Sequence, residues 1–284
     1  MIEFEPITGR YATLEIQGRR SRVYIEESGH GIPVLCLHTA GADSRQYRHF
    51  QTDLDVLDRF RVIAFDLPWH GKSLPPEQWW TREYLLTHDL YVETVIQVIR
   101  ALRLEQPIVV GCSMAGSLVL ELARLHGDEL GGVVGFSCAA KVNGRFQDWP
   151  LMPDVNSNQS VPSWTAALMA PQSPQPARKE VWWIYSQGGA GVYRGDTYFY
   201  SHGLDLRGRE EEIDTDCCPV YLYTGEYDFA CLAEDTEATL AKIPGAKGGR
   251  MGDIGHFPIS ENYPLCKTWL WPALWALADL RPDR

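Results

Sequence analysis

A serine lies between an apolar run and a helix-forming segment in the stretch from residue 108 to residue 126. Residues 108–110 are Ile-Val-Val, and Gly-Cys-Ser-Met-Ala-Gly follows them. β-Branched apolar residues favour a buried strand, whereas the residues from Ser117 to His126 favour a helix. Small residues at 111, 115 and 116 let the two backbones approach closely. The pattern therefore predicts a strand, a sharp turn with Ser113 at its apex, and a helix whose N-terminus faces a position suited to an anion.

Apolar runs and helix-forming segments alternate over most of the chain. Apolar and polar residues alternate over 11–17 and 20–27, which predicts an antiparallel hairpin. Further strands are predicted at 33–37, 61–65, 132–137, 219–224 and 247–251, and helices at 44–58, 84–104, 232–243 and 263–280. Asp43 or Ser44 is a candidate cap for the first helix, and Thr81 for the second. This alternation predicts a mostly parallel, doubly wound sheet with its sites at the C-terminal ends of the strands.

The alternation stops between about residues 141 and 207. This segment is rich in tryptophan, tyrosine and proline, and it includes Trp149, Trp164 and Trp183. We therefore expect an inserted lid over residues 141–207, on a core made of residues 1–140 and 208–284. The three tryptophans are candidates for the lining of a substrate pocket, although aromatic clusters more often form the core of a small cap.

Two further polar residues follow predicted strands and complete a set with Ser113. A serine hydroxyl becomes an effective nucleophile only beside a base, and the base needs an acid that orients it. Asp228 follows the strand at 219–224, and His256 follows the strand at 247–251 after the flexible Gly255. The order serine, acid, histidine therefore predicts a catalytic triad, with Glu226 or Asp253 as alternatives for the acid.

With these residues in view, the chain resembles the α/β-hydrolase fold superfamily, in its cofactor-free branch with a lid. The resemblance depends on His38–Gly41, Asp66–Ser73, the stretch 111–116, Asp228 and Gly255–His256. It implies an α/β-hydrolase fold: a mostly parallel, eight-stranded sheet flanked by helices, with an inserted helical lid and no cofactor.

The resemblance also implies a role for each site residue. Ser113 would be the nucleophile, His256 the general base and then the acid, and Asp228 the residue that orients the histidine. The backbone N–H groups of Ala40 and Met114 would form an oxyanion hole, in which each donor contributes ~3–4 kcal/mol.

The chain departs from the superfamily pattern at three positions. Thr39 replaces the usual glycine after His38, Trp69 replaces a glycine in the 66–73 segment, and Ala115 replaces a glycine after the serine. Thr39 is a candidate for substrate contact, and the alternative is that it only stiffens its loop. Phe257, beside the histidine, is a second candidate for substrate contact.

The function expected from this pattern is hydrolysis of a carboxylic ester or lactone of an apolar or aromatic small molecule through an acyl-enzyme. Hydrolysis of a carbon–carbon bond in a vinylogous diketone is the alternative, with Arg178 or Arg194 holding a substrate carboxylate. Perhydrolase activity is a further possibility within the same branch. A small-ligand receptor without turnover is an alternative of another class.

The composition limits the partners of such a protein. The chain has 284 residues and a net charge of −11, whereas nucleic acids and anionic membranes favour a basic surface. We see no signal peptide and no apolar run of the ~20 residues that a membrane span needs. Seven cysteines without metal-ligand spacing predict reduced thiols, no metal site and a cytoplasmic location. The apolar helix at 263–280 is expected to pack either on its own core or at a homodimer interface.

Overall fold

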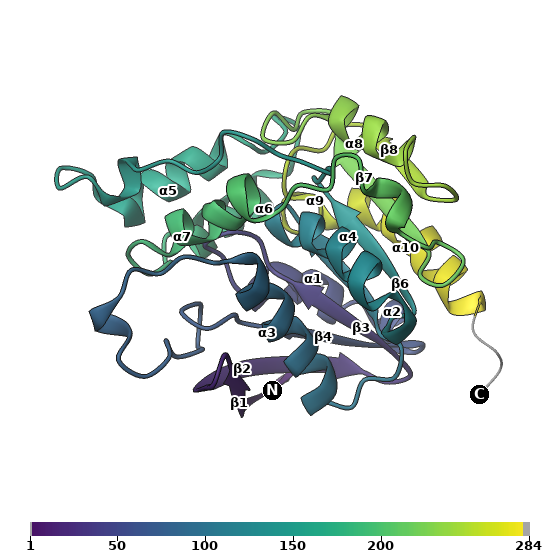
Figure 1. Ribbon diagram of the computed structural model, residues 1–284, viewed down its shortest axis with the longest axis horizontal. Coiled ribbons are helices and arrows are strands. Elements are labelled where there is room, and N and C mark those ends of the chain that lie inside the picture. The colour runs from purple at the N-terminus through teal and green to yellow at the C-terminus, as the bar shows by residue number, and fades with distance from the viewer. Residues whose placement is uncertain (1, 281–284) are drawn as a thin grey trace.

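One eight-stranded sheet forms the centre of the molecule (Figure 1). The structure is a computed structural model that describes residues 2–280. The strands are β1 (Thr8–Ile16), β2 (Arg19–Gly29), β3 (Ile32–Leu37), β4 (Phe60–Phe65), β5 (Ile108–Cys112), β6 (Gly132–Phe136), β7 (Val220–Gly225) and β8 (Lys247–Met251). Their order is β1-β2-β4-β3-β5-β6-β7-β8, and only the β1–β2 and β2–β4 pairs are antiparallel among the described residues. The predicted eight-stranded, mostly parallel sheet is confirmed.

Helices cover both faces of the sheet because successive strand residues point to opposite sides. Val109 packs in the layer that contains α3 (His88–Ala101) and α4 (Met114–His126). Val110 packs in the opposite layer, beneath α10 (Tyr263–Asp279). The apolar side of α10 is thus covered by its own sheet, which is one of the two alternatives expected from the sequence. No helix within residues 2–280 combines the length and the hydropathy of a bilayer span.

Two helix boundaries differ from the sequence expectation. The helix expected at 84–104 begins only at His88, and its cap is Thr87, whose side chain accepts a hydrogen bond from the Leu90 N–H at 3.3 Å. Thr81 is therefore not the cap. The preceding residues are held by tertiary contacts instead, since the Leu86 N–H donates to the carbonyl of Gly195 at 3.0 Å.

The segment expected to be one helix over 44–58 consists of three short turns. These are a 3₁₀ turn (Ser44–Tyr47), α1 (Arg48–Gln51) and α2 (Leu54–Leu57). Asp43 caps the first turn as expected, because its side chain accepts a hydrogen bond from the Arg45 N–H. The chain breaks at Thr52 and Asp53, whose backbone leaves the helical conformation.

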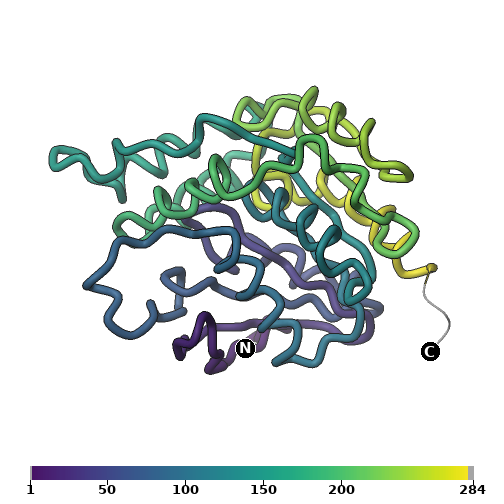
Figure 2. Tube along the Cα trace, viewed as in Figure 1, coloured from purple at the N-terminus to yellow at the C-terminus, as the bar shows by residue number. Residues whose placement is uncertain are grey.

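The chain between β6 and β7 forms an insert of short helices. They are α5 (Ser157–Ala166), α6 (Gln175–Tyr185), α7 (Val192–Tyr198) and a π-helical turn (Phe199–Gly203). Figure 2 traces this part in teal to green, along the upper left of the view. Its apolar residues pack with Ala42 and Phe257 of the core. The insert therefore lies over the edge of the sheet where strands β3 and β5 end, and its action as a lid stays a prediction.

Candidate active site

Ser113 occupies the apex of a strained turn between β5 and α4. Its backbone has φ 61° and ψ −122°, a conformation that residues with a side chain rarely adopt. Glycine is required on both sides of the serine: a Cβ on Gly111 would lie 2.4 Å from the Ala115 carbonyl oxygen, and one on Gly116 2.4 Å from that of Phe136. The expected strand, sharp turn and helix are present. The turn brings the serine side chain to the C-terminal edge of the sheet.

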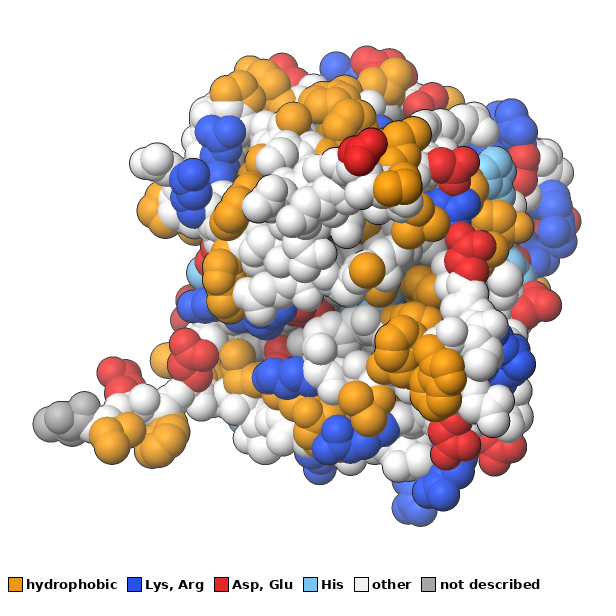
Figure 3. Space-filling model, turned by 90° about the vertical axis from the view of Figure 1, so that its left-hand side faces the viewer, with side chains coloured by type: hydrophobic (Ala, Val, Ile, Leu, Met, Phe, Trp, Pro, Cys, Tyr) orange, Lys and Arg blue, Asp and Glu red, His pale blue; other side chains and the backbone are white. Residues whose placement is uncertain are grey.

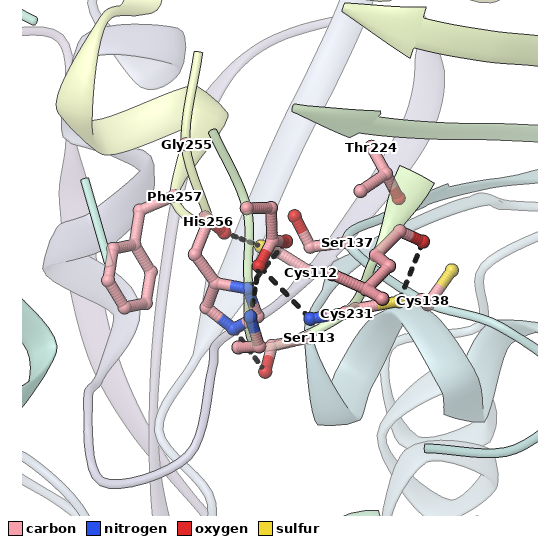
Figure 4. Close-up of polar contacts among 12 residues, drawn as sticks. Cys112, Ser113, Ser137, Cys138, Thr224, Cys231, Gly255, His256 and Phe257 are labelled. Carbon is pink, nitrogen blue, oxygen red and sulfur yellow. Dashed lines mark hydrogen bonds and ion pairs between the residues drawn. The ribbon is translucent and has the colours of Figure 1, made fainter. Parts of the chain in front are cut away.

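Ser113, His256 and Asp228 form a continuous hydrogen-bonded chain. The distance from Ser113 Oγ to His256 Nε2 is 2.8 Å, and that from His256 Nδ1 to Asp228 Oδ2 is 2.7 Å (Figure 4). A carboxylate only accepts hydrogen bonds, so Nδ1 carries the proton and donates it to Asp228. Nε2 is then an acceptor, and it faces the hydroxyl of Ser113. This is the arrangement that a serine nucleophile and its general base require.

Asp228 is the acid that the structure brings to His256. Its other oxygen, Oδ1, accepts hydrogen bonds from the N–H groups of Ala230 at 2.8 Å and Cys231 at 3.0 Å, which fix the carboxylate plane. The two alternatives from the sequence point elsewhere. Glu226 accepts from the Asp253 N–H, and Asp253 accepts from the side chain of Gln172.

Cys112 anchors the loop of His256 from below. Its Sγ donates to the backbone carbonyl of His256 at 3.2 Å (Figure 4). Burial raises the pKa of the Cys112 thiol well above its ordinary value. The thiol therefore stays protonated near neutral pH and is not a competing nucleophile.

Glu261 is a buried residue of this site that the sequence analysis did not single out. Its carboxylate accepts from the N–H groups of Gly255 at 2.6 Å and Phe257 at 3.1 Å, on either side of His256. It also accepts from the N–H of Ala170 and from the hydroxyl of Ser173, both in the insert. Burial raises the pKa of Glu261, and these hydrogen bonds oppose that shift. The residue ties the histidine loop to the insert.

The loop after β3 presents the backbone expected to hold an oxyanion. Ala40 lines the same small cavity as Ser113. Met114 is the first residue of α4, so its N–H has no partner within the helix. His38 braces the loop: its Nδ1–H donates to the Thr39 carbonyl at 2.9 Å, while its Nε2 accepts from the Leu67 N–H at 3.1 Å.

Thr39 is not among the residues that line the cavity, and its contact with substrate stays a prediction. Its N–H donates to Gln46 Oε1 at 2.9 Å, and its hydroxyl is hydrogen-bonded to Gln46 and to the hydroxyl of Tyr185. The residue is 2% exposed, and these hydrogen bonds use both its N–H and its hydroxyl. Thr39 therefore stiffens its loop, which is the alternative role expected from the sequence.

A second buried carboxylate, Asp196 of α7, binds the back of this loop. It accepts from the Gly41 N–H, from His70 Nε2 and from the Tyr84 hydroxyl, each at 2.7 Å. The other ring nitrogen of His70 donates to the Pro68 carbonyl at 3.0 Å, so both nitrogens face acceptors. Burial lowers the pKa of His70, whereas the Asp196 carboxylate, the Pro68 carbonyl and Asp66 together raise it, and the net pKa lies above its ordinary value. His70 is thus an imidazolium paired with Asp196.

The cavity at Ser113 is small, and three tyrosines and a phenylalanine form part of its wall. Its volume is about 10 Å³, which is room for about one water molecule. Phe257 lines it, as expected, together with Arg145, Tyr185, Tyr193 and Tyr200, which the sequence analysis did not select. The only signal for these tyrosines in the sequence was the aromatic-rich composition of the insert.

The three selected tryptophans are not among the residues that line this cavity, and their contact with substrate stays a prediction. Trp164 and Trp183 are 41% and 51% exposed, and Trp149 is a half-buried residue of the insert that packs against its apolar cluster. Trp164 comes nearest, since it contacts Arg145 and Tyr193 of the cavity wall. Helix packing turns these indoles outward, and the tyrosines take the inner positions.

Tyr200 lies directly beside the serine. Its hydroxyl donates to the Ser137 carbonyl at 2.8 Å, and it also forms a hydrogen bond with the Ser113 side chain. Burial raises the pKa of Tyr200 well above its ordinary value, so the phenol stays neutral. Within residues 2–280, no cluster of three or more His, Cys, Asp or Glu side chains is arranged to hold a metal ion.

Comparisons with known proteins agree with this architecture. The family description "alpha/beta hydrolase fold" matches residues 32–154. A 2-hydroxy-6-oxo-6-(2'-aminophenyl)hexa-2,4-dienoic acid hydrolase of Metapseudomonas resinovorans is 28% identical over 132 residues, which are 46% of this chain and 43% of that protein. The chain matches less than half the length of each of the curated relatives compared.

Solved structures match over nearly the whole chain. An esterase from Thermogutta terrifontis has a TM-score of 0.80 at 18% identity, covering 94% of this chain and 99% of that one. The enol-lactonase from Burkholderia xenovorans LB400 has a TM-score of 0.79 at 16% identity, covering 94% and 100%. At these identities the structural likeness establishes the fold. Together with the matched region and the strand order, it shows that the chain has the α/β-hydrolase fold.

Proposed function

We propose that this protein is a serine hydrolase that cleaves a carboxylic ester or lactone. The observation that carries the proposal is the hydrogen-bonded chain from Ser113 through His256 to Asp228. The structural relatives that are an esterase and an enol-lactonase support the same class of reaction. The Cys112 thiol contacts only the backbone carbonyl of His256 and stays protonated, whereas the Ser113 hydroxyl contacts the imidazole, so Ser113 is the attacking group in this proposal.

The reaction follows from the proton positions. His256 Nε2 takes the proton of Ser113 as Oγ bonds to the carbonyl carbon of the substrate, and the N–H groups of Ala40 and Met114 stabilise the resulting oxyanion. The C–O bond to the leaving alcohol then breaks, and the imidazolium gives that oxygen its proton. Water, deprotonated by His256, attacks the acyl-enzyme and releases the acid and free Ser113. Asp228 stabilises the imidazolium in both halves.

The lining of the cavity defines the class of substrate. Phe257, Tyr185, Tyr193 and Tyr200 present aromatic surface around Ser113, which suits an apolar or aromatic acyl group. A volume of about 10 Å³ does not admit such a group in this conformation. We therefore propose that residues of the insert move outward when substrate enters, as a lid does.

Arg145 favours a second candidate function. It lines the Ser113 cavity, and within the described residues no carboxylate forms an ion pair with it. Arg178 and Arg194, considered from the sequence, do not line that cavity, and Arg194 is already paired with Glu83 and Asp148. A guanidinium without a carboxylate partner near the nucleophile suits a substrate that carries a carboxylate. Hydrolysis of a carbon–carbon bond in an acidic vinylogous diketone, the activity class named for the Metapseudomonas relative, is that candidate.

A substrate panel separates these reactions. Purified protein is assayed with p-nitrophenyl butyrate, phenyl acetate, an enol-lactone and a 2-hydroxy-6-oxo-dienoate. Ester or lactone turnover that exceeds dienoate turnover in kcat/KM supports the first proposal. The reverse order, together with a loss of about tenfold or more in kcat/KM in Arg145→Gln, would establish the second. Saturable binding of these compounds with no turnover of any would instead identify a receptor.

A further inference from the structure

A second hollow of the molecule lies away from Ser113. It has a volume of about 260 Å³, against about 10 Å³ at the serine, and no residue lines both. Its walls come from the turn between β1 and β2, from the segment after β4, and from residues 76–94. Figure 3 looks onto this end of the molecule, where hydrophobic and basic side chains gather around a hollow surface. The volume suits a ligand of one or two rings.

Aromatic rings form one wall of this cavity. Trp69 lies 5.4 Å from Trp79 and 5.1 Å from Tyr84 between ring centroids, and all three line the hollow. Trp79 remains 44% exposed, although an indole of this size is usually more deeply covered. The wall therefore offers flat apolar surface that a planar ligand would cover.

The backbone at Trp69 is the second observation. Its φ is +82°, a region that a bulky side chain occupies only at a cost of about 1–3 kcal/mol. Glycine, the usual residue at this place in the superfamily pattern, would adopt it without strain. A tryptophan kept in a strained conformation on a cavity wall points to a role for the indole itself.

Two arginines supply the charge of the cavity. Arg19 and Arg82 both line it, and neither has a carboxylate within ion-pair distance among residues 2–280. The acidic residue of the lining, Glu83, is already paired with Arg194. In a chain of net charge −11, two unpaired guanidinium groups beside an aromatic wall are suited to an anion.

We propose that this cavity is a binding site for a small aromatic carboxylate, separate from the catalytic centre. The ring of the ligand stacks on Trp69, and the carboxylate pairs with Arg19 and Arg82. The site is connected to the catalytic loop, because Tyr84 of its wall donates to Asp196, which in turn accepts from the Gly41 N–H beside Ala40. Binding requires no turnover, so this inference does not depend on the proposed hydrolase activity.

Calorimetric titration of the full-length protein with 2-naphthoate tests the site. The neutral isostere 2-naphthamide should bind at least about tenfold more weakly, because it forms no charge-assisted pair. Trp69→Gly, which leaves a residue suited to φ +82°, and the double variant Arg19→Gln/Arg82→Gln should each weaken naphthoate binding about tenfold or more. Circular dichroism and thermal unfolding verify that each variant is folded.

Two matched substitutions fix the location. Arg103→Gln removes a guanidinium from a different surface hollow, and Arg145→Gln removes the one beside Ser113. Both should bind naphthoate as the wild type does. No saturable binding, equal binding of naphthoate and naphthamide, unchanged binding in both cavity variants, or loss of binding in Arg145→Gln would each overturn the proposal.

Discussion

His256 is held in place by groups on every side of its loop. Asp228 fixes the imidazole, Cys112 the backbone carbonyl, and Glu261 the two flanking N–H groups. The ring therefore has one orientation, with Nε2 at 2.8 Å from the hydroxyl of Ser113. Such preorganisation removes the need to align the base during the reaction.

Asp228→Asn should lower kcat about 10³- to 10⁴-fold and leave KM within a few-fold of the wild type. The asparagine amide can donate a hydrogen bond to Nδ1 of His256, which favours the tautomer that carries its proton on Nε2. Nε2 is then no longer able to accept the proton of Ser113. Steady-state kinetics with the best ester of the panel measures the effect.

Asp253→Asn is the matched control for this change. Asp253 has φ +58°, which asparagine tolerates, and it does not contact His256. Its activity should equal that of the wild type. A loss below tenfold in Asp228→Asn, or an equal loss in both variants, would remove Asp228 from the triad.

Sequence analysis identified the site residues that directly follow strands of the sheet. It missed the site residues that other elements bring to the site. Asp228 and His256 could be predicted because the ends of β7 and β8 meet at one edge of the sheet. Glu261 and Asp196 could not be predicted, because the sequence around an isolated acidic residue does not indicate which backbone N–H groups it contacts in the fold. Tyr200 comes from the insert, whose helices have no periodic relation to the sheet.

At the scale of elements, α7 is attached to the core by a buried ion pair. Asp196 of α7 and His70 after β4 are at most 1% exposed, and Asp196 also binds the Gly41 N–H. The start of the helix near this contact was poorly predicted because tertiary contacts hold the segment that precedes it. The segment before α3 is held by two hydrogen bonds, from the Leu86 N–H to Gly195 and from the Tyr84 hydroxyl to Asp196. Helix α3 therefore begins only after its cap, Thr87.

The ion pair should make stability depend on pH. The pKa of His70 is raised in the folded protein, so its contribution is complete below the ordinary histidine value of about 6.5 and is lost as pH rises through the folded value. The melting temperature of the wild type should therefore fall, relative to His70→Gln, between pH 6 and pH 9.

Differential scanning calorimetry of both proteins at several pH values gives this difference. His30→Gln, at an exposed histidine, serves as the control and should follow the wild type at every pH. A wild-type advantage that stays constant or grows toward pH 9 would show that His70 is not a charged partner of Asp196.

At the scale of the whole molecule, a small cavity at Ser113 lies beneath a helical insert. The sequence predicted the core and the presence of an insert from the interrupted alternation of strands and helices. It could not predict which aromatic side chains face inward, because α5 and α6 expose Trp164 and Trp183 and bury Tyr185. Under the proposed function, a cavity of about 10 Å³ requires that side chains of the insert move before a substrate enters.

Occupation of Ser113 by a bulky group should loosen the insert. A phosphonate bearing an aromatic group cannot fit the cavity, so its attachment must displace the side chains above it. Hydrogen exchange followed by mass spectrometry should show faster exchange in residues 157–203 and unchanged exchange in β5 and β6. Unchanged exchange in the insert of fully labelled protein would contradict its role as a lid.

Labelling with a fluorophosphonate tests the central claim most directly. Peptide mass spectrometry should locate one adduct on Ser113 in the wild type and in Cys112→Ala. Ser113→Ala should carry no adduct and lose ester turnover by at least about 10³-fold, while remaining folded. An adduct at another residue, or turnover that persists in Ser113→Ala, would contradict the assignment of Ser113 as the nucleophile.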